Sequence, residues 1–333
     1  MKGKQGLVCM GLLLVLSSCS CHTGKQITAS GLQRKDFQTE VNGQHTDLFT
    51  LSNKQGMEVC ITNYGARVVS ILVPDRNGKR EDVVCGFSTI TEYMEQPQTF
   101  GSTVGRYIGR ILNARFTLDG VEYKLVPNNG KSGHISHGGN PGFADRIWKV
   151  EQADTHRVRL SYLSPDGENG FPGNLKVTLV YSLGEDDNAL DLTYEATTDA
   201  PTVLNLSHHS FFNISGNFTK SVEDQQLWVD ADRFTPYDDK KCVTGEYLPV
   251  AGTPLDFRMP HAIGECIDAD HPQLKVVNGY DHTWELNTKG DDTRPAAWVY
   301  DPTSGRKMEI FTTEPGIQIY TGNGLKGKMT GKR

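Results

Sequence analysis

The stretch LKVTLVYSLGEDDNALDLTYEATT, residues 175–198, carries the clearest structural pattern in the chain. Two runs in it alternate Val, Leu and Tyr with polar residues, and a Gly-Glu-Asp-Asp-Asn segment separates them. Because successive side chains of a strand point to opposite faces of a sheet, this alternation predicts two strands that each bury one face. The stretch therefore predicts a long antiparallel β-hairpin.

Similar patterns occur on both sides of this hairpin. They are ARFTLDGVEYKL (114–125), which alternates around Asp-Gly, AAWVYDPTSGRKMEIF (296–311), and MEVCITNYGARVVSILVPDRNGK (57–79), which breaks at residues 63–65. The sequence contains no convincing long amphipathic helix, exact repeat or low-complexity segment. We therefore predict an all-β protein built as a large antiparallel β-sandwich or barrel.

The composition is that of a globular protein, with 37% hydrophobic and 22% charged residues among 333. The formal net charge is -6 and no stripe of Lys and Arg is present, so nothing indicates a nucleic-acid partner. The seven cysteines are scattered without a CxxC pair. This distribution argues against both a disulfide framework and a zinc site.

The N-terminus has the features of an export signal. Lys2 and Lys4 precede an apolar run that is too short to span a bilayer, and LSSC resembles the lipobox of bacterial lipoproteins. We expect cleavage before a lipidated Cys19; a plain signal peptide with an incidental cysteine is the alternative. The expected organisation is a signal at 1–18, a polar linker at 19–45 and one domain at 46–333. The protein would be exported, as a periplasmic or outer-membrane-associated lipoprotein that touches the membrane only through its lipid.

Three histidine-containing stretches are candidates for chemistry: HISHGG (134–139), NLSHHSFFN (205–213) and GYDHTW (279–284). A metal site is one reading, because histidine with carboxylate suits zinc or a similar ion. The spacing of His134 and His137 is not that of the helical zinc motif. Proton transfer on a polar substrate is the other reading, because histidine titrates near neutral pH.

The residues around His208 and His209 allow the two to be compared. If residues 204–212 form a strand, the even-numbered residues share a face that carries two leucines and is expected to pack inward. His209 shares its face with Asn205 and Ser207, which suits an open polar cleft. The pattern favours His209 as the acid–base residue, unless the register breaks within SHHS.

The stretch GSTVGRYIGR (101–110) is less specific. Its spaced glycines lack the strand-turn-helix context of a dinucleotide fingerprint. Arg106 and Arg110 could each be an ordinary ion-pair residue, or one of them could reach a substrate oxygen as a rigid donor fork.

Five blocks together resemble one family in their order along the chain. They are VGRYIGRILNARFTLDG (104–120), HISHGGNPGFADRIW (134–148), NLSHHSFFNISG (205–216), NGYDHTWEL (278–286) and TEPGIQIYTGNGLKGK (313–328). They are similar to blocks of the aldose 1-epimerases, the galactose mutarotase family, from about Phe49 to Lys328. The resemblance implies a galactose mutarotase-like supersandwich with an open sugar cleft. It also implies interconversion of the α and β anomers of free hexoses such as glucose and galactose, without a cofactor for the chemistry.

The resemblance also implies roles for individual residues. His209 would be the proton donor at the ring oxygen, and His137 would hydrogen-bond near the ring oxygen and C1. Gly109 stands where many members carry asparagine, which removes or moves one sugar contact. Phe211 and Trp284 would form apolar walls or belong to the core. The implied substrate-binding set is Arg110, Gly109, Asp281, Gln318, Ser210 and Phe211.

The family's base is a glutamate in a later strand that reads roughly Leu-Glu-Thr-Gln. The chain ends at Arg333 before such a strand, and Glu314 is not a motif match for it. We therefore expect the chain to be C-terminally incomplete. A non-catalytic sugar-binding relative is the alternative to the enzyme. A polysaccharide lyase or glycosidase is a third reading, but glycosidases commonly need two facing carboxylates.

Two further expectations concern calcium and assembly. Some bacterial members of the family depend on calcium, and the acidic loop at residues 185–187 is the candidate position for a structural Ca²⁺. The loop has no EF-hand-like spacing of ligands. A monomer is the default expectation for the oligomeric state.

Overall fold

The computed structural model describes residues 26–332, with the exception of residues 97, 326 and 328. The expected export signal at 1–18 and the expected lipidation site at Cys19 lie outside the described residues. Within the described ranges, no helix is both long enough and apolar enough to cross a membrane.

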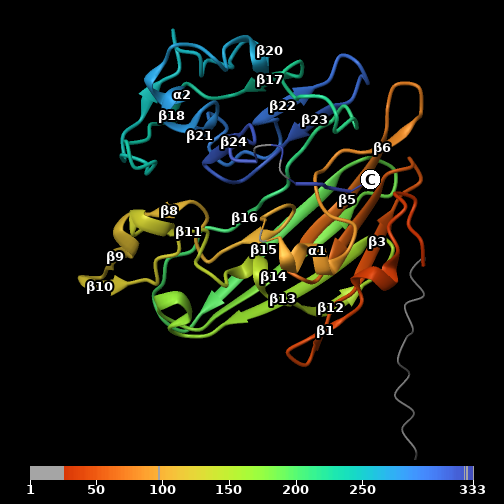
Figure 1. The fold of residues 1–333 in the computed structure, drawn as a ribbon, viewed down its shortest axis with the longest axis horizontal. Helices are drawn as coiled ribbons and strands as arrows, with labels where there is room; N and C mark the ends of the chain where they lie inside the picture. Colours follow the sequence, from red (N-terminus) through yellow and green to blue (C-terminus); the bar gives the residue numbers. More distant parts are fainter. Residues whose placement is uncertain (1–25, 97, 326, 328, 333) are drawn as a thin grey trace, which may run out of the picture.

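The described residues form a mostly β structure whose main sheets are antiparallel (Figure 1). The first sheet contains β3 (Leu48–Ser52), β4 (Glu58–Thr62), β5 (Arg67–Pro74) and β6 (Arg80–Asp82). The second contains β12 (Lys149–Ala153), β13 (Arg157–Ser164), β14 (Leu175–Leu183) and β15 (Leu190–Thr198). The third contains β20 (His261–Ala262), β17 (Gln226–Val229), β22 (Ala297–Tyr300) and β23 (Lys307–Ile310). The fourth contains β19 (Leu248–Pro249), β18 (Arg233–Thr235), β21 (Asp281–Glu285) and β24 (Gly316–Tyr320).

Short strand pairs and helices complete the structure. The pairs are β1 (Glu40–Val41) with β2 (Gln44–His45), β7 (Thr103–Val104) with β16 (Ser207–His208), β8 (Arg110–Ile111) with β11 (Ile135–Ser136), and β9 (Arg115–Leu118) with β10 (Val121–Lys124). The α-helices are α1 (Ile90–Glu95) and α2 (Pro272–Val277). The 3₁₀ turns are η1 (Arg34–Phe37), η2 (Leu112–Ala114), η3 (Gly130–Ser132), η4 (Phe143–Asp145), η5 (Glu168–Gly170) and η6 (Ile263–Glu265).

The predicted hairpins are confirmed. β14 and β15 pair antiparallel in continuous register from Leu175 opposite Thr198 to Leu183 opposite Leu190. Every odd-numbered residue of β14 is buried, as the alternation predicted. The Asp-Gly hairpin appears as β9 and β10, and the stretch at 296–311 appears as β22 and β23.

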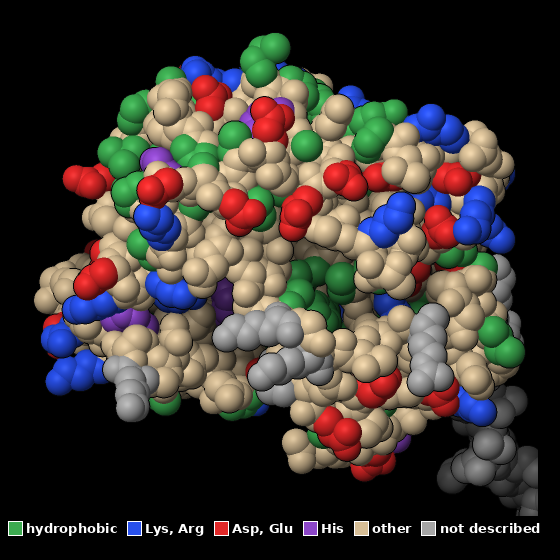
Figure 2. Space-filling view, turned by 45° about the horizontal axis from the view of Figure 1, so that its top comes forward, with side chains coloured by type: hydrophobic (Ala, Val, Ile, Leu, Met, Phe, Trp, Pro, Cys, Tyr) green, Lys and Arg blue, Asp and Glu red, His purple; other side chains and the backbone are tan. Residues whose placement is uncertain are grey.

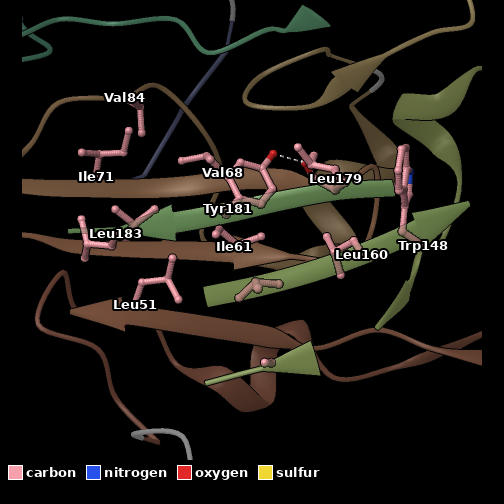
Figure 3. Packing of buried hydrophobic residues seen from close by; sticks show 14 of the residues in the cluster. Leu51, Ile61, Val68, Ile71, Val84, Trp148, Leu160, Leu179, Tyr181 and Leu183 are labelled. Atoms are coloured by element: carbon pink, nitrogen blue, oxygen red, sulfur yellow. Dashed lines mark hydrogen bonds between the residues drawn. The ribbon is translucent and has the colours of Figure 1, made fainter. Parts of the chain in front are cut away.

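The larger core lies between the first and second sheets (Figure 3). Ile61 and Val68 come from the first sheet, and Leu160 and Leu179 come from the second; all four are fully buried. The Tyr181 hydroxyl donates a 2.7 Å hydrogen bond to the carbonyl of residue 66, so its polar end is satisfied inside the core. A second cluster, which includes the fully buried Trp284, joins the third and fourth sheets.

A buried arginine connects the two halves of the chain. Arg306, only 6% exposed, donates to the carbonyls of Ser215 (2.9 Å) and Lys79 (3.0 Å) and pairs with Glu81 at 3.3 Å. Figure 1 shows the later sheets, in blue, beside the earlier ones, in orange and green. The face shown in Figure 2 is hollowed near its middle, and hydrophobic side chains are visible in the hollow.

Residues 26–45 are not an extended linker, contrary to the prediction for 19–45. Phe37 is fully buried, Leu32 is 5% exposed, and both pack in a cluster with Phe87 of the main body. Arg34 also forms an ion pair with Asp47. The prediction rested on the polar composition of this segment. Its two buried apolar residues, Leu32 and Phe37, nevertheless pack it against the main body.

Candidate active site

His137 is held in place by the backbone around it. β8 and β11 place Arg110 opposite Ser136, and the amide of His137 donates to the carbonyl of Gly109 at 2.9 Å. The amide of Gly109 donates in turn to Nδ1 of His137 at 3.2 Å, which puts the proton of the neutral ring on Nε2. The backbone amide of Gly109 therefore fixes the tautomer of the His137 ring.

The glycine that follows His137 is required by close packing. Gly138 has φ +79°, and a Cβ built on it would lie 1.9 Å from the carbonyl oxygen of Gly105. Any larger residue would push the His137 segment away from the backbone at Gly105 and Arg106. Close backbone approach thus explains the first glycine of HGG, whereas a Cβ on Gly139 would lie 2.6 Å from the side chain of Asn169.

His209 lies beside His137. Its amide donates to the carbonyl of Ser102, and its carbonyl accepts from the amide of Gly101. The rings of His137 and His209 are 5.5 Å apart and nearly perpendicular. Phe211 stacks on His209 at 5.1 Å and also contacts the buried Phe100 edge-on at 4.9 Å.

His208 points to a different environment. Its Nε2 lies 2.6 Å from the hydroxyl of Ser210, its Nδ1 is sheltered without a partner, and its ring packs near Tyr181 of the core. The side chain of Ser210 is thus engaged by His208. These contacts agree with the expectation that His208 is the structural member of the pair.

The prediction of one strand over residues 204–212 was wrong except at Ser207 and His208. Only Ser207 and His208 pair with β7, and Leu204, expected to pack inward, is 41% exposed. The register is not maintained because the partner strand is itself only two residues long. The rings of His208 and His209 still have different neighbours, Tyr181 and His137 respectively, although His209 lies just beyond the two-residue strand.

The fourth sheet supplies the opposite side of the site. β21 and β24 pair Asp281 with Tyr320 and Thr283 with Gln318, so these four residues share one face. Nε2 of Gln318 donates to Oδ1 of Asp281 at 2.7 Å. Tyr320 contacts Phe211 edge-on at 5.7 Å, which joins this face to the histidine side.

Arg110 lies between the two sides. Its guanidinium donates to the carbonyl of Lys241 at 3.0 Å. Its charge acts on groups of both sides, because it lowers the pKa of His137 and opposes the rise in the pKa of Asp281. An arginine in this position can present its remaining donors to a polar ligand.

Burial sets the charge state of the site. It lowers the pKa of His137 to about 3, with further contributions from His209 and Arg110. It also lowers the pKa of His209, and the buried Arg67 nearby adds to that shift. Burial raises the pKa of Asp281, against the bond from Gln318. Most of both imidazoles is therefore neutral at neutral pH, so His209 can act as an acid only in the fraction of molecules in which it carries a second proton.

Several candidates from the sequence lie elsewhere. Arg106 is 1% exposed and is bound by Ser164 and the carbonyl of Pro172, so it has a structural role. His134 is buried and accepts from the amide of Asn113. Trp284 is a core residue rather than a cleft wall, with its indole bound to a backbone carbonyl. Glu314 is exposed in the turn before β24.

The described residues were also compared with what a metal site requires. Among residues 26–332 that the structure describes, no group of three or more His, Cys, Asp or Glu could hold a metal ion. In the acidic loop at 185–187, Glu185 is paired with Lys54 at 2.6 Å. A cation there would have to compete with that ammonium group.

Tyr237 is a site residue that the sequence did not indicate. Its hydroxyl is 3.4 Å from Nε2 of Gln318, although it comes from the loop after β18 rather than from any of the five motif blocks. Tyr320 was also missed, although it lies within the block that supplied Gln318. The alternation of β24 was a usable signal for Tyr320, because residues two apart share a face.

Comparisons with known proteins agree on one family. The family model "Aldose 1-epimerase" matches residues 47–333. The chain is 39% identical over 284 residues to the galactose mutarotase of Sus scrofa, covering 85% of this chain and 80% of the relative. It is 36% identical over 286 residues to the aldose 1-epimerase of Escherichia coli K12, covering 86% and 81%.

Solved structures give the same result. The GalM/aldose epimerase homologue from C. elegans superimposes with a TM-score of 0.78 at 31% identity, covering 86% of this chain and 85% of that one. A galactose 1-epimerase from Lactobacillus acidophilus NCFM gives a TM-score of 0.76 at 30% identity, covering 86% and 82%.

Proposed function

The chain belongs to the aldose 1-epimerase family, and we propose that its cleft interconverts the α and β anomers of free hexoses with His209 as the acid. It is an isomerase that acts on the anomers of aldoses. The observation that carries the assignment of the site is the pair of partly desolvated imidazoles, His137 and His209, 5.5 Å apart beside Arg110.

The reaction is a pair of coupled proton transfers. The protonated form of His209 gives a proton to the ring oxygen, the bond from C1 to that oxygen breaks, and the C1 hydroxyl gives its proton to a base, for which solvent water is an available acceptor. The product is the open-chain aldehyde. Rotation about the C1–C2 bond and the reverse transfers close the ring as the other anomer. C1 keeps its oxidation level throughout, so no electrons need to be supplied.

The residues of the cleft divide this work. Burial makes the imidazolium of His209 a stronger acid than usual, which favours release of its proton to the ring oxygen. His137, neutral with its proton on Nε2, would donate a hydrogen bond near the reacting oxygens. Asp281, Gln318 and Arg110 would hold the sugar hydroxyls. No residue that the structure describes is assigned as the base at the C1 hydroxyl.

We also infer that the sheets pair face to face as a β-sandwich. The inference is supported by the side chains that the first and second sheets contribute to one cluster, and by the second cluster between the third and fourth sheets. Such a scaffold would keep the two sides of the cleft at a fixed separation, as precise proton transfer requires.

Asp281→Asn tests the sugar-binding side. The substitution removes a charged acceptor, and hydrogen bonds to charged groups contribute about 1.5–3 kcal/mol. We expect the KM for D-galactose mutarotation to rise about 10- to 100-fold, with a smaller change in kcat. The measurement is initial-rate polarimetry of the full-length protein.

Glu314→Gln is the matched control, because it removes an exposed carboxylate just before β24. It should leave KM and kcat within about twofold of wild type. Equal effects of the two substitutions would refute the assignment of Asp281 to the sugar.

A further inference from the structure

Tyr237 is positioned more firmly than a loop residue normally is. It follows β18 in the segment that returns through Val243, with which it forms an isolated β-bridge. The side chain of Gln273, on α2, accepts from its amide at 2.8 Å and donates to its carbonyl at 3.0 Å. Its ring packs on His282 at 5.4 Å, and the residue is only 8% exposed. Both the backbone and the ring are therefore fixed from outside the loop.

The hydroxyl at the end of this ring reaches the face of the fourth sheet that carries Gln318 and Asp281. Nε2 of Gln318 points toward it at 3.4 Å, and Gln318 is itself exposed on the face that carries Asp281. Arg110, which binds the same loop through the carbonyl of Lys241, interacts with this hydroxyl as well. The loop at 236–244 thus contributes one side chain and one carbonyl to the cleft.

The Tyr237 hydroxyl accepts hydrogen bonds, but its own proton has no acceptor among the described residues. The amide of Gln318 and the guanidinium of Arg110 are both donors, so they can satisfy only the oxygen of Tyr237. Among the hydrogen bonds of the described residues, none is donated by the Tyr237 hydroxyl. Its proton is available for an acceptor that enters the cleft.

We propose that Tyr237 is a specificity-determining residue, whose hydroxyl donates a hydrogen bond to one hydroxyl oxygen of the bound aldose. This inference rests on the proposed function of the cleft. The contact would be made to the sugar beside Gln318 and Asp281, and it selects sugars that present an oxygen at that position. A site built to hydrogen-bond a substrate hydroxyl rejects analogues that lack it, because its own polar group is then left unpaired.

The protonation state of Tyr237 is compatible with this role. Burial, with the charge of Asp281 nearby, raises the pKa of Tyr237 to about 12. The phenol therefore remains a donor throughout the pH range in which the enzyme can be assayed.

Tyr237→Phe tests the proposal, because it removes only the hydroxyl. KM and kcat would be measured by polarimetry for D-galactose and for its 2-, 3-, 4- and 6-deoxy analogues. We expect the KM for D-galactose to rise about 3- to 10-fold, the effect of losing one neutral hydrogen bond, with kcat within about twofold. One of the deoxy sugars lacks the hydroxyl that Tyr237 contacts. For that sugar, Tyr237→Phe should raise KM by less than about twofold.

Tyr300→Phe is the matched control. The Tyr300 hydroxyl likewise accepts a 3.4 Å hydrogen bond, from Arg76, but it lies in the third sheet, away from Gln318 and Asp281. It should change KM by less than twofold for every sugar. An unchanged KM in Tyr237→Phe, or a penalty of equal size for all the deoxy sugars, would overturn the proposal. If wild-type protein fails to accelerate mutarotation of any of the sugars, the proposed function itself fails and this inference fails with it.

Discussion

Replacing His209 by asparagine is expected to lower kcat/KM for D-galactose mutarotation by about 10²- to 10⁴-fold, the usual contribution of a positioned general acid. Asparagine has a similar size and retains hydrogen-bonding groups, but it cannot deliver a proton to the ring oxygen. The backbone of residue 209 is fixed by hydrogen bonds to the backbone of Gly101 and Ser102, so the substitution should leave the fold intact. Initial-rate polarimetry measures the loss, and circular dichroism checks the fold.

His208→Asn is the control next in the chain. His208 bonds Ser210 and packs near Tyr181, away from the pair formed by His137 and His209. We expect this variant to keep kcat/KM within a few-fold of wild type. Loss of activity in His208→Asn, with activity retained in His209→Asn, would reverse the assignment of the acid.

Acid is expected to destabilise the protein well before its carboxylates titrate. Burial lowers the pKa of His208 to about 3 and that of His282 to about 4, in each case from an ordinary value of about 6.5. Between about pH 6.5 and 4 the unfolded chain binds protons that the folded chain does not, so stability falls as the pH falls.

The size of this effect follows from the linkage between proton binding and folding. At pH 5 each of these two histidines is expected to cost about 2 kcal/mol relative to pH 7.5, and together about 4 kcal/mol; His137, whose pKa is lowered to about 3, adds a similar amount. That is a large part of the 5–15 kcal/mol that stabilises typical proteins. Urea denaturation at pH 7.5 and pH 5 measures the difference.

His208→Asn again supplies the control, because it removes one of the buried histidines whose pKa is lowered. The loss of stability between pH 7.5 and pH 5 should shrink by about 2 kcal/mol in this variant. A pH dependence identical to that of wild type would show that the pKa of His208 is not depressed in the folded protein.

The strands could be predicted from the sequence because their signals are local. The alternation in 175–198 placed Leu179 and Tyr181 on the buried face, and the Asp-Gly pair located a hairpin turn. Such patterns depend on residues that are neighbours along one strand. The pairing of distant motifs, such as His137 with His209, came from family resemblance rather than from pattern.

The incorrect predictions share a different cause. Leu204 is exposed because its segment has only a two-residue partner strand, and Phe37 is buried because a distant cluster receives it. Tyr237 is held in place in part by Gln273, 36 positions later in the chain, which hydrogen-bonds its backbone. These outcomes depend on tertiary contacts that no single segment encodes.

The central claim is that this cleft moves protons between a histidine and a free sugar. The most direct measurement is the optical rotation of freshly dissolved α-D-galactose with the full-length protein. The account predicts that rotation approaches equilibrium faster than in buffer, at a rate proportional to protein concentration. A correctly folded protein that leaves the rate at its buffer value would contradict it.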